Sequence, residues 1–218
     1  MSRRCLLFLF LIFSLSWGQD QTEKLPLEGV SICIDPGHGG SSKGAIGKRG
    51  FTEKEVNLLV SQRLTAYLRE AGAVVYLTRD RDVEVPLKDR TDEANFHNCD
   101  RCISIHHNAS LNRKPNYTAT FVHPREGIES ASVELAGAIT SNLQQALEIR
   151  PGLGDISGEL PGVKTANFHM VREARMPSVL VEISFLSNET EEARLRDSEY
   201  RDLSAQAIYL AILKLFVH

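Results

Sequence analysis

The sequence predicts an α/β fold built on a single open, mostly parallel, twisted sheet with helices on both faces. Short apolar runs of strand length alternate along the chain with longer segments of helical period. Most of these runs are apolar almost without interruption, which is typical of strands that helices cover on both faces. Alternation of this kind also implies right-handed crossover connections between parallel strands.

Five apolar runs and four segments of helical period are the predicted elements. The predicted strands are Gly29–Asp35, Ala73–Arg79, Arg101–His107, Tyr117–His123 and Ser178–Leu186. The predicted helices are a segment that follows Thr52, Pro86 to about Asn98, Ile128–Ile149 and Tyr200–Val217. In the first helix Val56, Val60 and Leu64 fall on one face, and Gly72 is placed to end it. The segment Arg150–Lys164 is rich in glycine and proline, and we expect a loop long enough to border a groove.

The first residues are predicted to be a secretory signal peptide and not part of the fold. A short basic head, Arg3 and Arg4, precedes the unbroken apolar run Cys5–Phe13, and small residues follow at a plausible cleavage point. The run is too short to span a bilayer comfortably, and an uncleaved membrane anchor is the alternative interpretation. The chain is therefore divided into a signal peptide at residues 1–18, a short tether at 19–28 and one domain at 29–218.

The charge balance argues against one class of partner. Without Arg3 and Arg4, 23 of the 25 basic residues remain, against 28 acidic ones. Because a nucleic-acid-binding protein would present a basic face, we expect no nucleic-acid partner. No later stretch is apolar enough to cross a membrane. We expect an exported monomer, periplasmic or outside the cell, with no stable membrane insertion after the signal is removed.

Three cysteines remain after the signal, and an odd number excludes complete internal pairing. Cys99 and Cys102 have the CxxC spacing of a redox pair or of half a zinc knuckle. No second CxxC exists, and Cys102 begins a predicted strand. We therefore interpret Cys33, Cys99 and Cys102 as small apolar residues, with one disulfide as the alternative.

Two residues near the first turn of the fold are candidates for chemistry. His38 lies in the turn IDPGHGG directly after the first strand, at the sheet edge where open α/β folds bind ligands. Thr52 and Glu55 have the spacing of a capping box, which makes Glu53 the first residue of the helix. The positive end of the helix dipole would then keep the Glu53 carboxylate ionised. Each position alone is also compatible with an ordinary loop histidine or first-turn acid.

Two adjacent histidines and one carboxylate complete the candidates. His106 and His107 end the run RCISIHH and point to opposite faces of the sheet, and their spacing does not decide which of them is functional. Glu182 lies inside the apolar run SVLVEISFL, where a carboxylate is costly to bury unless it is paired or works as an acid or base. The structural alternative is a salt bridge to Arg172 or Arg175.

Together these residue types suggest a metal site. Two histidines and one carboxylate are the usual protein ligands of a catalytic zinc ion that keeps a fourth position for water. A further glutamate near the metal can take the proton from that water and pass it to a leaving amine. One cleft at one edge of the sheet could hold all four candidates.

In this order and spacing, the chain resembles the zinc-dependent N-acetylmuramoyl-L-alanine amidases, the family of bacterial cell-separation and spore-lysis amidases. The likeness runs from about Val30 to Phe216. It rests on the segments ICIDPGHGG, TEKEVNLLVSQRLTAYLREAGAVVYLTR, LKDRTDEAN, ISIHHNA and MPSVLVEISFLSN. Any one of these segments is a weak signal, but the ordered set is highly specific.

The resemblance implies an activity and assigns roles. It implies zinc ligands at His38, Glu53 and His106 and a catalytic glutamate at Glu182. It therefore favours His106 over His107, which stands where the family more usually has alanine. The implied reaction is hydrolysis of the amide bond between N-acetylmuramic acid and L-alanine in peptidoglycan, by a zinc-bound water with a glutamate general base. It does not identify the substrate-binding residues.

The resemblance also bears on regulation. Some members of the family carry an additional helical insertion that covers the zinc until an activator protein removes it. Here one helix, one loop and one short strand account for His123–Pro177, so we expect an open site and no activator protein. A metal ligand from Ile128–Arg150 would contradict this expectation.

Two alternative functions stay open. A zinc peptidase acting on the stem peptide would share the metal chemistry and differ in its product. A non-catalytic wall-binding domain would be expected if Glu182 were replaced by a residue that cannot ionise, which is not the case.

Arg90 and Asn57 also match family positions, and we interpret them as residues that brace loops. His123 and His169 are interpreted as partly buried, hydrogen-bonded histidines that could line the cleft.

Overall fold

The computed structural model describes residues 24–154, 156 and 160–217, and within them the chain forms one six-stranded sheet. The strands are β1 (Ser31–Pro36), β2 (Val74–Leu77), β3 (Arg101–Asn108), β4 (Ala119–Val122), β5 (Val163–Thr165) and β6 (Ser178–Phe185). Their order across the sheet is β2-β1-β3-β6-β4-β5. Every neighbouring pair is parallel except β4 and β6. The prediction of an open, mostly parallel sheet is confirmed.

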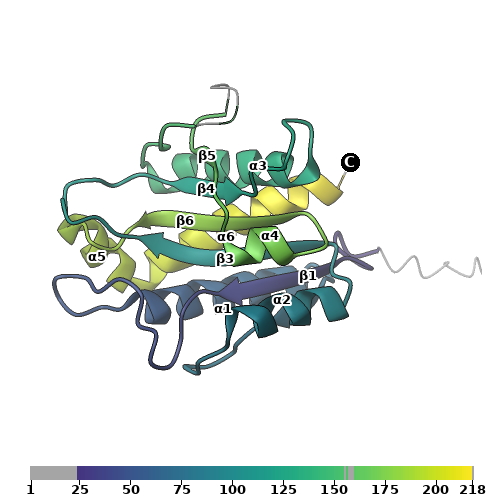
Figure 1. The fold of residues 1–218 in the computed structure, drawn as a ribbon, viewed down its shortest axis with the longest axis horizontal. Helices are drawn as coiled ribbons and strands as arrows, with labels where there is room; N and C mark the ends of the chain where they lie inside the picture. Colours follow the sequence, from purple (N-terminus) through teal and green to yellow (C-terminus); the bar gives the residue numbers. More distant parts are fainter. Residues whose placement is uncertain (1–23, 155, 157–159, 218) are drawn as a thin grey trace, which may run out of the picture.

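Helices cover both faces of this sheet, as predicted. They are α1 (Glu53–Glu70), α2 (Leu87–Phe96), α3 (Ala131–Leu147), α4 (His169–Glu173), α5 (Glu189–Arg196) and α6 (Ser198–Phe216). On one face α6 packs between α1 and α3, whereas α2 and α4 pack together on the other (Figure 1). No helix in the described ranges has the length and apolar character needed to cross a membrane.

The pleat of the strands sorts the buried side chains into two cores. Ile34 of β1 and Ile103 of β3 are fully buried in the larger core, which α1, α3 and α6 complete. Cys33 and Cys102 point to the other face, into a smaller core that includes Met170 of α4. Polar residues of the same strands share this second face, and the functional site is built there.

The cysteines are buried and unpaired, which agrees with their interpretation as small apolar residues. All three described cysteines, Cys33, Cys99 and Cys102, have free thiols, so the alternative of one disulfide is wrong. Burial raises the pKa of Cys99 to about 12. A thiol with so high a pKa is protonated at neutral pH and is a poor nucleophile.

Two short helices, α4 and α5, were not predicted from the sequence. The prediction that residues 123–177 contain only one helix, one loop and one short strand is wrong, because α4 lies within that segment. Helix α4 is too short to show a hydrophobic period in the sequence.

The predicted signal peptide lies outside the described residues. Of the predicted tether, residues 24–28 are described, and Leu27 is fully buried with its N–H bonded to the Ala71 carbonyl at 2.8 Å.

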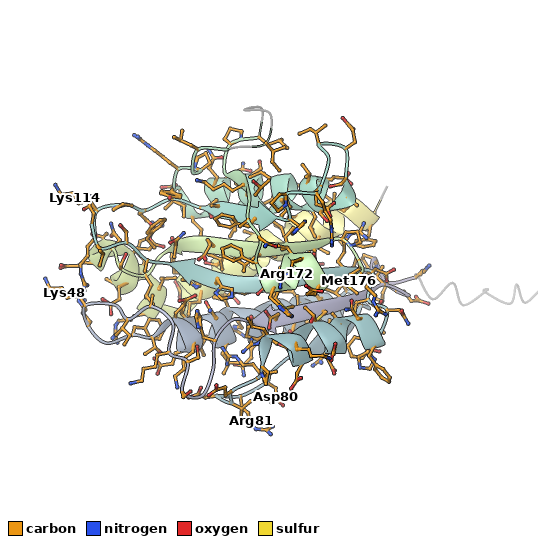
Figure 2. The ribbon with its side chains drawn as sticks, viewed as in Figure 1. Lys48, Asp80, Arg81, Lys114, Arg172 and Met176 are labelled. Carbon is orange, nitrogen blue, oxygen red and sulfur yellow. The ribbon has the colours of Figure 1, made fainter. Side chains whose placement is uncertain are left out.

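The carboxyl ends of β1, β3 and β6 lie at one end of the molecule, beside α5 (Figure 1). Lys48 and Lys114, in the loops that follow β1 and β3, lie at this same end (Figure 2). In open α/β folds this edge of the sheet is where ligands bind.

Candidate metal centre

Three of the predicted site residues meet where β1 and β3 end and α1 begins. His38 lies two residues after β1, Glu53 is the first residue of α1, and His106 lies close to the end of β3. One ligand atom from each residue lies within 4.8 Å of the other two. Across the described residues, this is the one group of at least three His, Cys, Asp or Glu side chains close enough to share a metal ion.

The Glu53 carboxylate lies between the two imidazole rings. Its Oε2 is 3.2 Å from Nε2 of His38, and its Oε1 is 2.8 Å from Nδ1 of His106. The two rings meet edge to face with centroids 5.1 Å apart. Two ligand atoms bound at about 2.0–2.1 Å to one tetrahedral zinc ion are separated by about 3.3 Å. The spacing of these three side chains therefore fits a single zinc ion.

The electrostatics of the cluster favour the metal-binding form of Glu53. Burial by itself would raise the pKa of this carboxyl, but hydrogen bonds to His106 and His38 hold it far below its usual value. Burial likewise acts to lower the pKa of His106, and the bond to Glu53 outweighs it, so that the net shift is upward. Glu53 is consequently ionised at neutral pH, as a metal ligand must be.

Local sequence explains where Glu53 points. Thr52 is the N-cap of α1, and its backbone N–H donates to Oε2 of Glu55 at 3.0 Å, which confirms the predicted capping box and helix start. The backbone N–H of Ala45 donates to Oε2 of Glu53 at 2.8 Å. Gly44, with φ +64°, lets the chain pass this close, because a Cβ there would lie 2.4 Å from the same oxygen.

Two buried arginines hold the turn that carries His38. Arg90 of α2 donates to the carbonyls of Pro36 and His38 at 2.8 and 2.7 Å. It also pairs with the buried carboxylate of Asp35 at 2.8 Å. Nε of Arg79 also donates to the Pro36 carbonyl, at 2.8 Å. The prediction that Arg90 braces a loop is confirmed, whereas Arg79 was not singled out.

Glu182 lies beside the cluster, on the strand next to that of His106. The strand register pairs Glu182 with His106, and both residues line one cavity of about 580 Å³ together with His38 and Glu53. Oε2 of Glu182 is buried and has no hydrogen-bond partner among the described residues. Burial raises the pKa of this carboxyl to about 7. A carboxyl with this pKa can both accept and release a proton near neutral pH.

The alternative of a structural salt bridge for Glu182 is wrong. Arg172, labelled on α4 in Figure 2, pairs with Glu173 at 2.6 Å instead. The described part of the chain contains no ion pair between Glu182 and Arg175 either. The nearby His106 acts to lower the pKa of the Glu182 carboxyl but does not outweigh its burial, so the net shift is upward. A buried carboxyl with a raised pKa is typical of a functional site.

His107 points to the opposite face of β3 from His106. Its side chain is buried at 1% exposure, and its Nδ1 lies 2.8 Å from Oδ1 of Asn57. Burial lowers the pKa of His107 to about 3, so the ring is neutral. The structure therefore brings the His106 ring, and not that of His107, to the Glu53 carboxylate.

The walls of the cavity come from two segments in which the sequence indicated only His169 as a residue that could line the cleft. Residues 84–87, which lead into the first turn of α2, and residues 168–170, at the start of α4, line it. Leu87 and Phe168 present exposed apolar side chains there, at 59% and 40% exposure. The loop Arg150–Lys164 was expected to border the groove, but none of its described residues lines this cavity.

The remaining histidines largely fit their interpretation. His169 lines the cavity and its Nε2 lies 3.2 Å from Oγ1 of Thr91. His123 is partly buried and hydrogen-bonds to Asn167 at 3.2 Å, but it does not line the cavity. A contact that sequence reasoning missed is that of Ser42, whose Oγ lies 2.9 Å from Nδ1 of His38.

A family model described as N-acetylmuramoyl-L-alanine amidase matches residues 32–214. The chain belongs to this family. Among its amidase relatives is N-acetylmuramoyl-L-alanine amidase LytC of Bacillus subtilis (strain 168), which is 36% identical over 187 residues. That alignment covers 85% of this chain but 35% of LytC, so the chain spans about a third of that relative's length.

Solved amidase structures share the fold. N-acetylmuramoyl-L-alanine amidase AmiC2 of Nostoc punctiforme superimposes with a TM-score of 0.76 at 31% identity, covering 85% of this chain and 96% of that one. The CwlD amidase from Clostridioides difficile, solved in complex with the GerS lipoprotein, gives a TM-score of 0.75 at 29% identity. That match covers 85% of this chain and 97% of CwlD. The amidase family and the α/β fold predicted from the sequence are both confirmed.

Proposed function

We propose that this member of the amidase family hydrolyses the amide bond between N-acetylmuramic acid and L-alanine in peptidoglycan. Zinc held by His38, Glu53 and His106 would be its cofactor, and Glu182 its general base. The observation that carries the proposal is the meeting, in one cavity, of a three-residue metal cluster and a buried carboxylate without a partner. Membership of the amidase family supports the choice of substrate.

The donor set supports zinc as the metal. Two imidazole nitrogens and one carboxylate oxygen are the protein ligands of many catalytic zinc sites. Nδ1 of His38 is engaged by Ser42, which leaves Nε2 free to bind metal. When bound in such a site, zinc lowers the pKa of a water molecule and polarises a carbonyl group.

The roles of the protein groups follow from where Glu182 lies. We infer that its carboxylate takes a proton from water as the water oxygen forms a bond to the lactyl carbonyl carbon. As the carbon–nitrogen bond breaks, the same carboxyl gives that proton to the departing amine of L-alanine. The second proton of the water stays on the new lactyl carboxylic acid, which then releases it to the solvent or to the freed amine. The products are a muramic acid with a free lactyl carboxylate and a stem peptide with a free amino terminus, and no nucleophilic serine or cysteine is needed.

We further propose that the site is accessible without an activator protein and that the chain is exported. No residue of Ile128–Arg150 belongs to the ligand cluster or lines the cavity. The CwlD amidase was solved with the GerS lipoprotein, so addition of such a partner is an informative control. Export rests on the predicted signal peptide at residues 1–18.

Release of soluble fragments from purified peptidoglycan tests the proposal. The purified protein, assayed alone, is expected to release fragments when loaded with zinc, to stop after treatment with a chelator and to recover when zinc is restored. Activity that survives complete removal of metal would contradict the zinc mechanism. Zinc-bound protein that is inactive alone but active with an added partner would contradict the accessible site.

A further inference from the structure

The side chain of Asn57 contacts all three segments that carry the candidate zinc ligands. It lies one turn after Glu53 on α1 and is fully buried. Its Nδ2 lies 3.5 Å from Oε1 of Glu53 and donates to the carbonyl of Gly37, directly before His38, at 3.2 Å. Its Oδ1 lies 2.8 Å from Nδ1 of His107, on the strand that carries His106.

These contacts fix which atom donates and which accepts. An amide has donors only on nitrogen and an acceptor only on oxygen. Because the Asn57 nitrogen faces the Gly37 carbonyl and the Glu53 carboxylate, its oxygen faces His107. Nδ1 of His107 must therefore carry the hydrogen of this bond. The backbone N–H of His107 also donates to Oε1 of Glu53, at 3.3 Å.

We propose that His107 is a positioning residue that fixes the amide of Asn57, and through it the Glu53 carboxylate and the His38 turn, in the arrangement that binds zinc. The inference rests on the proposed function, since it takes zinc to be the bound ion. Nδ1 of His107 is the one group among the described residues that donates to Oδ1 of Asn57, so without it only the contacts of Nδ2 with Gly37 and Glu53 would hold the amide in this orientation. A rotated amide would turn its oxygen toward the Glu53 carboxylate, and the two acceptors would repel each other.

The expected size of the effect follows from other metal sites. Groups that hydrogen-bond to metal ligands from outside the ligand set typically change metal affinity by about 10–100-fold when they are removed. Asn57 and His107 are both excluded from water. Water therefore cannot easily replace the lost hydrogen bond, and we expect zinc affinity to fall by about 10-fold or more.

Two substitutions of similar shape separate the hydrogen bond from packing. In His107→Asn the side-chain amide nitrogen can occupy nearly the position of imidazole Nδ1 and donate to Asn57. In His107→Leu a methyl group replaces that nitrogen and the donor is lost. Zinc affinity of the metal-stripped proteins is measured by competition with a chelator of known affinity, and circular dichroism checks that each variant is folded. We expect His107→Asn to bind zinc within about 3-fold of the wild type and His107→Leu to bind about 10-fold more weakly or worse.

Each outcome bears on a different claim. A folded His107→Leu protein with wild-type zinc affinity, or equal losses in the Asn and Leu variants, would overturn the positioning role and leave the proposed function intact. If the wild-type protein itself binds no zinc, both proposals fail. Should His107→Leu not fold, Asn57→Ala removes the same hydrogen bond from its other partner. A folded Asn57→Ala protein with wild-type zinc affinity would then overturn the inference.

Discussion

At the scale of single residues, a substitution of Glu182 should separate the catalytic step from metal binding. It lines the cavity but is not one of the three clustered ligands. We expect Glu182→Gln to lower kcat by about 10²–10⁴-fold, because general acid–base catalysis contributes on that scale. Its zinc content should stay at the wild-type level. Steady-state kinetics on peptidoglycan and metal analysis of the same sample check both, and a variant that keeps most of its activity would exclude Glu182 as the base.

The same substitution has a consequence for stability in the metal-free protein. Burial raises the pKa of Glu182 from near 4.5 to about 7 in the folded state, so the folded protein binds this proton more tightly than the unfolded chain. Stability from this group is therefore fully present below about pH 4.5 and is lost as pH rises through 7. At pH 8 we expect metal-free Glu182→Gln to be more stable than the wild type, by up to an order of 3 kcal/mol.

Urea unfolding of the metal-free proteins at two pH values measures this effect. At pH 4 the Glu182 carboxyl is mostly protonated in both states, so the difference between wild type and Glu182→Gln should nearly vanish. Equal stability of the two proteins at pH 8 would show that the Glu182 carboxylate is not held in a costly environment.

At the scale of elements, the connection between β1 and α1 brings His38 and Glu53 together. Gly44 has φ +64°, and a Cβ there would lie 2.4 Å from Oε2 of Glu53 and 2.6 Å from Cδ2 of His38. Gly50, in the same connection, has φ +84° with open space around it. Alanine at either position carries a similar backbone strain, but only at Gly44 does it also displace a ligand.

These two glycines form a matched pair of substitutions. We expect Gly44→Ala to weaken zinc binding by about 10-fold or more, since distorted ligand geometry costs metal affinity on that scale. Gly50→Ala should bind zinc as the wild type does while losing similar stability. Chelator competition measures zinc affinity, and thermal unfolding measures stability. Equal zinc affinities in the two variants would contradict the claim that a side chain at position 44 displaces a zinc ligand.

Elements set by local signals could be predicted from the sequence, and those set by tertiary contacts could not. The capping box of Thr52 and Glu55 placed the start of α1 correctly. The spacing of His106 and His107 could not show which face of β3 carries the site, because that depends on which helices cover each face. Apart from His169, nothing local indicated that residues 84–87 and 168–170 would line the cavity. These segments are far apart in the chain and meet only because α2 and α4 pack on one face of the sheet.

At the scale of the whole molecule, zinc should act as a cross-link between parts of the fold distant in sequence. Its three proposed ligands, His38, Glu53 and His106, come from the turn after β1, from α1 and from β3. A ligand that binds only the folded state adds about 2.7 kcal/mol when its free concentration is 100 times Kd. We expect the Tm to fall when a chelator removes zinc and to rise with zinc concentration.

A ligand variant provides the control for this stabilisation. His38→Ala removes one proposed ligand, so its Tm should respond much less to zinc than that of the wild type. Differential scanning calorimetry with and without zinc measures both proteins. If zinc shifts the Tm of His38→Ala as much as that of the wild type, the ion binds elsewhere.

The identity of the bond that is cut tests the central claim most directly. Zinc-loaded protein is incubated with purified peptidoglycan, and mass spectrometry identifies the released fragments. The proposed amidase activity predicts intact stem peptides with a free L-alanine amino terminus, released only when zinc is present and lost in Glu182→Gln. Fragments cut within the stem peptide would contradict it and would identify the enzyme as a peptidase.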